Sequence, residues 1–178
     1  MEEIQLTNIL SGSVCLFDVK RLAAQACSTD DISWLAELSL CSNIVVAKNA
    51  AWVMTHFDNK QISHLSSFQS RFVDCILTTN STSLRRLLLN IVNRLSIRQE
   101  DIRTDFLDFC LTRILSAEEP LGVRSLCMKL SFQQCRYFPD LLLELKTTLS
   151  LIQPTDPPAL RSTKNKIDTL IDNILCDE

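Results

Sequence analysis

Apolar residues recur along this chain at the spacing of one face of an α-helix, and the same arrangement occurs three times. Each copy has apolar residues at positions i, i+3, i+4 and i+7. These are Ala47, Ala50, Ala51 and Met54 in the first copy, Leu84, Leu87, Leu88 and Ile91 in the second, and Val123, Leu126, Cys127 and Leu130 in the third. The copies start 37 and 39 residues apart, a period typical of helical repeat arrays.

Further stripes and their bounding turns predict the other helices. Two helices, over 2–10 and 17–27, precede four helix pairs: 31–41 with 44–57, 60–79 with 83–95, 100–115 with 120–132, and 138–152 with 159–175. Polar clusters at 28–30 and 80–82 provide N-caps. Residues 96–99 have the spacing of a capping box before the helix over 100–115. The pattern therefore predicts an all-α fold of about four antiparallel helix pairs.

Composition supports this fold and narrows the functions. The chain of 178 residues is 46% hydrophobic and 22% charged, which is typical of a globular protein. Only 2 glycines are present, which argues against hairpin-rich β folds and phosphate-binding glycine loops. No apolar run approaches the ~20 residues of a membrane span, and the acidic start does not fit a secretory signal. We expect a soluble cytoplasmic protein with no membrane association.

The organisation expected is one helical-repeat domain over residues 1–178. Residues 1–30 would form N-terminal capping helices, 31–152 the repeat core, and 159–176 a C-terminal capping helix, since terminal repeats must cover their apolar outer face. The paired residues Leu84-Arg85 and Val123-Arg124, together with Ala50-Ala51, resemble the second helix of HEAT repeats. This resemblance to the HEAT/armadillo family covers roughly residues 30–152 and implies a right-handed α-α superhelix that presents a surface to a partner.

Basic residues beside the first apolar position of each copy are the main candidate site residues. In the frame that starts at Ala47 these are Lys48, Arg85 and Arg124, and Arg86 follows directly. A frame that starts the first copy at Val46 is equally consistent with the sequence. Stacked repeats would align these cations into a ladder, which either holds neighbouring repeats together or binds an anionic partner. Trp52 lies on the same helix as Lys48 and is either a core residue or an aromatic anchor.

No pattern indicates catalysis. The nucleophile-elbow, P-loop and dinucleotide motifs require glycines that the chain lacks. The 8 cysteines form no C-x-x-C pair and the 2 histidines lie eight residues apart, so we expect no catalytic residues, no metal site and no cofactor. Whether the protein is an enzyme stays uncertain, with a non-enzyme favoured.

Two functions fit these observations. The favoured one is a non-catalytic module that binds a partner protein through Lys48, Trp52, Arg85, Arg86 and Arg124. The alternative is a nucleic-acid-binding protein similar to the HEAT-like DNA alkylation-repair glycosylases. That resemblance implies the aromatic role for Trp52 and contacts to phosphates for Arg85, Arg86 and Arg124. A net charge of −3 spread over both halves makes nucleic acid the less favoured partner. The oligomeric state and the identity of the partner are left open.

Overall fold

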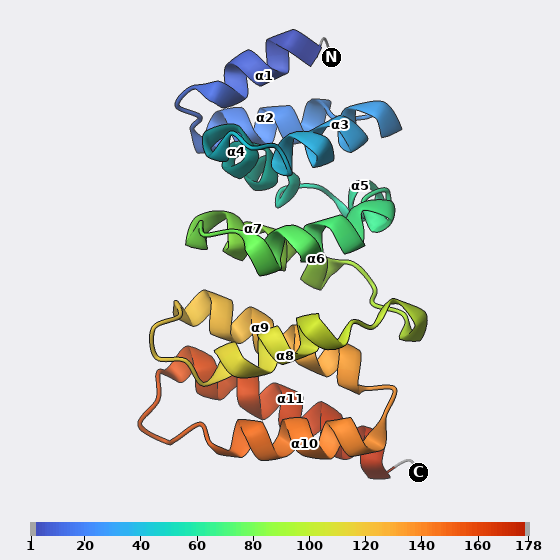
Figure 1. Cartoon of the computed structure of the whole chain (residues 1–178), viewed down its shortest axis with the longest axis vertical. Helices are drawn as coiled ribbons and strands as arrows, with labels where there is room; N and C mark the ends of the chain where they lie inside the picture. The colour runs from blue at the N-terminus through green and yellow to red at the C-terminus, as the bar shows by residue number, and fades with distance from the viewer. Residues whose placement is uncertain (1–2, 177–178) are drawn as a thin grey trace. The chain divides into compact units, whose positions relative to one another are not determined.

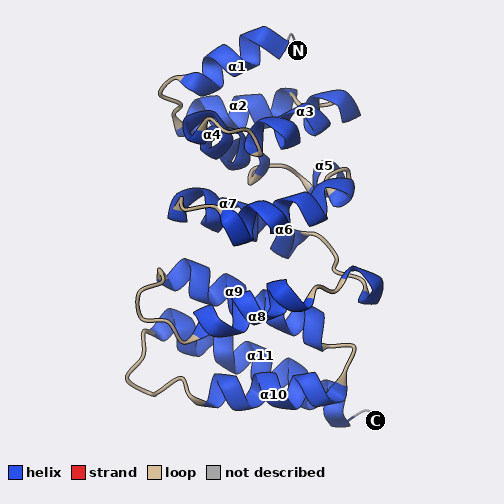
Figure 2. Ribbon diagram, viewed as in Figure 1, coloured by secondary structure: helices blue, strands red, loops and turns tan. Residues whose placement is uncertain are grey.

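The structure, a computed structural model, describes residues 3–176, so residues 1–2 and 177–178 of the predicted domain lie outside the described part. Every regular element between residues 3 and 176 is helical, and no strand occurs there (Figures 1 and 2). The predicted all-α fold is thereby confirmed. The chain divides into two compact units, Met1–Leu95 and Ser96–Glu178.

The first unit contains seven α-helices and one 3-10 turn among its described residues. They are α1 (Glu3–Ser11), α2 (Leu16–Gln25), α3 (Thr29–Ser39), α4 (Ile44–Met54), α5 (Asn59–Ser63), η1 (Ser66–Phe68), α6 (Gln69–Thr78) and α7 (Thr82–Arg94). Side-chain caps define several helix starts: Ser28 accepts from the Asp31 amide, and Ser81 accepts from the Leu84 amide. Both N-cap clusters expected from the sequence are therefore present, and each satisfies an otherwise unpaired amide of a first helical turn.

Helix α4 is the centre of the first unit and packs against α1, α2, α3 and α7. Its small residues explain why so many helices can approach it. Ala47, Ala50 and Ala51 are completely buried, as is Met54, and alanine allows close contact between helix backbones. Helix α7 packs against both α4 and α6, and its Leu88 and Ile91 are also completely buried.

The second unit contains one 3-10 turn and four α-helices among its described residues. They are η2 (Gln99–Asp101), α8 (Thr104–Ile114), α9 (Leu121–Cys135), α10 (Pro139–Ser150) and α11 (Pro158–Cys176). Helix α9 is central here and packs against α8, α10 and α11. Cys127 and Leu130 of α9 are completely buried, as the third copy of the pattern predicts, whereas Leu126 is only half-buried. The role of residues 159–176 as a capping helix stays a prediction.

Two expected helices differ from the observed ones. The single helix predicted over 60–79 is interrupted between α5 and α6. At the end of α5, Ser63 Oγ donates to the Lys60 carbonyl at 2.6 Å and so competes with the backbone for this acceptor. The start of α5 is also held from outside, because the side-chain Nε2 of Gln61 donates to the carbonyls of Ala23 and Ala26 at 2.8 and 2.9 Å. The spacing of apolar residues cannot predict the hydrogen bonds of Ser63 and Gln61, so it predicted one continuous helix.

The helix predicted over 100–115 begins only at Thr104, and the capping box predicted over 96–99 is wrong. Arg98 precedes the 3-10 turn with no side-chain cap and pairs with Asp101 at 2.8 Å. The carbonyl of Ile97 accepts hydrogen bonds from Tyr137 Oη at 2.7 Å and from Arg136 at 3.3 Å. This contact from a residue 40 positions away fixes the Ile97 carbonyl, and the α-helix does not extend back to it.

Hydrogen bonds from a side chain to a backbone carbonyl about one repeat earlier occur at several places in the chain. Asn49 donates to carbonyls 39 and 37 residues earlier, Arg94 donates to carbonyls 39 and 37 residues earlier, and Tyr137 donates to one 40 residues earlier. In each case a polar side chain satisfies backbone carbonyls about one repeat earlier, in a loop or in the last turn of the helix before it. These bonds supply polar links between repeats in addition to the apolar stripes.

Candidate partner-binding site

The first residues of helices α4, α7 and α9 and the burial of their apolar positions determine how the three copies of the pattern align. The N-caps Asn43, Ser81 and Pro120 of α4, α7 and α9 are 38 and 39 residues apart. In that alignment Val46 corresponds to Leu84 and Val123, and these three residues are 3%, 2% and 0% exposed. The frame that starts at Val46 therefore describes the structure, and the frame that starts at Ala47 is shifted by one residue.

The shift changes which cations are equivalent. Ala47 occupies the position of Arg85 and Arg124, while Lys48 occupies the position of Arg86. The predicted ladder of Lys48, Arg85 and Arg124 thus separates into two sets: Arg85 and Arg124 at one position of the repeat, and Lys48 and Arg86 at the next. The two sets have different surroundings.

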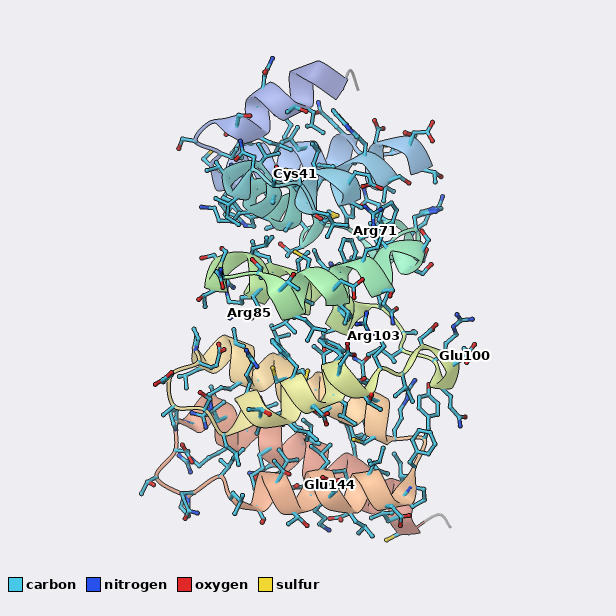
Figure 3. The ribbon with its side chains drawn as sticks, viewed as in Figure 1. Cys41, Arg71, Arg85, Glu100, Arg103 and Glu144 are labelled. Atoms are coloured by element: carbon cyan, nitrogen blue, oxygen red, sulfur yellow. The ribbon has the colours of Figure 1, made fainter. Side chains whose placement is uncertain are left out.

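Arg85 and Arg124 satisfy the carboxyl ends of the helices that precede them. Arg85, which lies on α7 (Figure 3), donates through Nη2 to the Thr79 carbonyl at 2.5 Å and through Nε to the Ile76 carbonyl at 3.5 Å. Arg124 is 7% exposed and donates through Nε to the Ile114 carbonyl at 2.8 Å. A guanidinium at this place pairs with otherwise unsatisfied carbonyls and with the negative end of the helix dipole. This geometry supports a structural role for both residues.

Lys48 and Arg86 border a surface hollow instead. The hollow has a volume of about 480 Å³ and lies within the first unit. Its lining comes from the loop between α1 and α2 and from helices α4 and α7: Gly12, Ser13, Val14, Val45, Lys48, Asn49, Trp52, Ser83, Arg86 and Leu87. Three of the five residues expected to bind a partner, Lys48, Trp52 and Arg86, are thus brought together.

One wall of the hollow is held in place by Asn49. This side chain is 6% exposed and donates both amide hydrogens, to the Leu10 carbonyl at 2.9 Å and to the Gly12 carbonyl at 3.2 Å. The loop that contains Ser13 and Val14 is thereby fixed against α4. The sequence analysis did not single out Asn49, although a polar residue between the buried Ala47 and Ala50 was a signal that it has a specific partner.

The cations of the hollow have no carboxylate partners among residues 3–176. Two other cations of the first unit are paired with carboxylates: Arg71 contacts Glu37 through two bonds of 2.5 and 2.7 Å, and Arg21 lies 3.5 Å from Asp18. Arg86 is exposed and Lys48 half-buried. Since the lining includes no carboxylate, the two positive charges act together on whatever enters the hollow.

The other half of the lining is apolar. Trp52 is half-buried, Leu87 is 7% exposed and Val45 is 41% exposed. Two further apolar residues of the first unit are exposed but do not line the hollow: Ile44 is 47% exposed and Phe17 is 73% exposed. The hollow combines an aromatic and aliphatic surface with two cations, which is a composition suited to binding.

The polar side chains of the lining are two hydroxyls, one amide and two cations. It includes no carboxylate, imidazole or thiol. The Ser13 and Ser83 hydroxyls and the Lys48 amine are its side chains of types that act as nucleophiles in enzymes. Within residues 3–176, no three or more histidine, cysteine, aspartate or glutamate side chains gather as a metal site would require. None of the helices described is both long and apolar enough to cross a bilayer.

Stacked helix pairs with polar links at a period of 37 to 40 residues define a helical repeat protein. Comparison with known families is consistent with this class. The family model of the HEAT repeat domain matches residues 6–171, and the chain therefore belongs to the HEAT repeat family.

A solved structure with a similar fold is a designed armadillo repeat protein. It aligns with a TM-score of 0.62 at 14% sequence identity, over 97% of this chain and 88% of that chain. At this identity the likeness concerns the fold alone. No curated protein matches the chain significantly in sequence.

Proposed function

We propose that this protein is a non-catalytic interaction module that binds a partner protein at the hollow lined by Lys48, Trp52 and Arg86. The observation that carries the proposal is the meeting of two cations without carboxylate partners and a half-buried tryptophan around one hollow. The chain belongs to the HEAT repeat family, and helical repeat arrays typically use their extended surfaces for binding, which supports this class of function.

The separation of the basic residues favours a protein partner over nucleic acid. A phosphate backbone is bound by several cations that follow the strand. Here Arg85 and Arg124 donate to helix carbonyls, so the expected ladder loses two of its members to intramolecular bonds. Two cations beside an apolar surface are better suited to a protein surface that has its own apolar and acidic groups.

The test compares two charge-reversal variants for retention of bound proteins. The site variant carries Lys48→Glu and Arg86→Glu. The control variant carries Lys20→Glu and Lys60→Glu, which makes the same change in net charge at exposed residues of the first unit that do not line the hollow.

Each protein is expressed at native level, captured from native cell extract, and analysed for bound protein and nucleic acid. We expect a protein that is retained by the unmutated chain and the control variant and lost from the site variant. Equal retention by both variants would contradict the proposal. Retained nucleic acid that is lost from the site variant would favour the alternative function.

A further inference from the structure

We propose that the occupant of the hollow is an acidic segment of a partner protein in which an apolar side chain is flanked by aspartate or glutamate. This inference rests on the proposed function and adds the chemistry of the ligand. Lys48, Arg86 and Trp52 are the residues that would recognise it.

Charge complementarity identifies the acidic component. Lys48 comes from α4 and Arg86 from α7, at equivalent positions of two successive repeats, and both border the same hollow. Because no carboxylate lines the hollow, the two cations repel each other without local compensation. An incoming carboxylate removes this repulsion and gains charge-assisted hydrogen bonds. A basic segment would increase it.

The apolar half of the lining identifies the second component. Trp52, Leu87 and Val45 present hydrocarbon surface to the hollow. A purely polar ligand would leave this surface in contact with water. An apolar side chain that covers it gains about 25 cal/mol for each Å² removed from water, and a tryptophan in a partly enclosed site is a frequent binding hot spot.

The side-chain donors that border the hollow with Asn49 are Lys48, Arg86 and the hydroxyls of Ser13 and Ser83. One lysine and one arginine on different helices offer one positive group per repeat, which suits single negative charges spaced along a peptide. The hollow of about 480 Å³ is in the range of small-ligand sites and holds a few side chains. Phosphate is bound best where several donors converge on one group, and a phosphoserine peptide tests whether these donors do so.

Dye-labelled nine-residue peptides test this chemistry by fluorescence anisotropy with the full-length chain. The acidic peptide has the core Glu-Glu-Leu-Glu-Glu. Three comparison peptides replace glutamate with glutamine, replace leucine with serine, or replace one glutamate with phosphoserine. A single-stranded oligonucleotide is a fifth probe, and all are measured at about 0.05 and 0.15 M salt.

We expect saturable binding of the acidic peptide that weakens at the higher salt concentration. The glutamine and serine peptides should each bind at least about tenfold more weakly, because a charge-assisted hydrogen bond or a buried leucine contributes at least the 1.4 kcal/mol that corresponds to tenfold in Kd. The site variant Lys48→Glu with Arg86→Glu should lose binding, Trp52→Ala should weaken it, and the control variant Lys20→Glu with Lys60→Glu should retain it.

Three results would overturn the inference: equal binding of the acidic and glutamine peptides, binding of the phosphoserine peptide alone, or tighter binding of the oligonucleotide. Far-UV circular dichroism of each variant establishes that it is folded. If charge reversal unfolds the unit, the more conservative variant Arg86→Gln replaces it and should still weaken binding of the acidic peptide. Failure of the inference can be distinguished from failure of the proposed function. Suppose that a partner protein is lost from the site variant in the capture experiment, and that the chain shows no preference for the acidic peptide. This pair of results refutes only the proposed ligand chemistry and leaves the proposed function standing.

Discussion

Adjacent arginines on α7 provide a stringent test of the two roles assigned to basic residues. Arg85 donates to the carboxyl end of α6, whereas Arg86 is exposed beside the hollow. Replacing each arginine in turn with methionine keeps most of the aliphatic length and removes the guanidinium. The two variants therefore differ in the role of the lost group and not in the chemistry of the change.

The magnitude for Arg85→Met follows from its bonds. The contact from Nη2 to the Thr79 carbonyl, at 2.5 Å, is a charge-assisted hydrogen bond worth about 1.5–3 kcal/mol. The contact from Nε to the Ile76 carbonyl is long at 3.5 Å and adds little. Loss of a cation at a helix carboxyl end costs roughly 0.3–1 kcal/mol more. We expect a total loss of about 2–4 kcal/mol, against a change within about 0.5 kcal/mol for Arg86→Met.

The assay is equilibrium unfolding in urea, followed by tryptophan fluorescence. Trp34 and Trp52 are the 2 tryptophans of the chain, and both lie in the first unit with Arg85 and Arg86. The signal therefore reports on the unit that carries the substitutions, even where the two units unfold separately. Equal loss of stability in the two variants, or a loss below about 0.5 kcal/mol for Arg85→Met, would refute the structural role.

Three further predictions concern packing, the wall of the hollow and pH. Leu88→Ala should lower the free energy of unfolding by about 2–5 kcal/mol, because Leu88 is completely buried; a change below about 0.5 kcal/mol in urea unfolding would mean that the repeat stripe is misassigned. Asn49→Ala should cost about 1–3 kcal/mol in the same assay, since the carbonyls of Leu10 and Gly12 lose their donor; an unchanged midpoint would contradict this. Burial raises the pKa of the Cys135 thiol from 9.0 to about 12. The unfolded thiol then loses its proton before the folded one, so the contribution of Cys135 to stability is complete below pH 9 and falls as the pH rises toward about 12. Urea unfolding followed by circular dichroism from pH 8 to about 10.5 should show a shallower decline for Cys135→Ala than for the unmutated chain, and parallel declines would refute the shift.

Most of the secondary structure could be predicted from local pattern. The apolar stripes of α4, α7 and α9 and the caps at Ser28 and Ser81 depend on residues within one or two helical turns. Where a helix end is decided by a distant residue, local reasoning gave the wrong boundary. Gln61, in the helix predicted over 60–79, bonds to carbonyls 35 and 38 residues earlier. Tyr137 bonds to the carbonyl of Ile97, 40 residues earlier, in the segment before α8.

The candidate site shows the same division. Residue types and the repeat period led to Lys48, Trp52, Arg85, Arg86 and Arg124, and three of these line the hollow. The sequence could not assign the roles of the arginines. Arg85, which donates to helix carbonyls, and Arg86, which borders the hollow, are neighbours in the chain, so a shift of one residue in the alignment of the copies exchanges their roles.

By itself, then, the sequence determined the helical class, the repeat period and the residue types available for binding, because these depend on local periodicity and composition. Only the tertiary structure decided which basic residues stay accessible. Neighbouring residues on a helix point about 100° apart, so Arg85 reaches the carbonyls at the end of α6 while Arg86 borders the hollow with Lys48 and Trp52. That difference arises from the packing of one helix against the next, which no local pattern records.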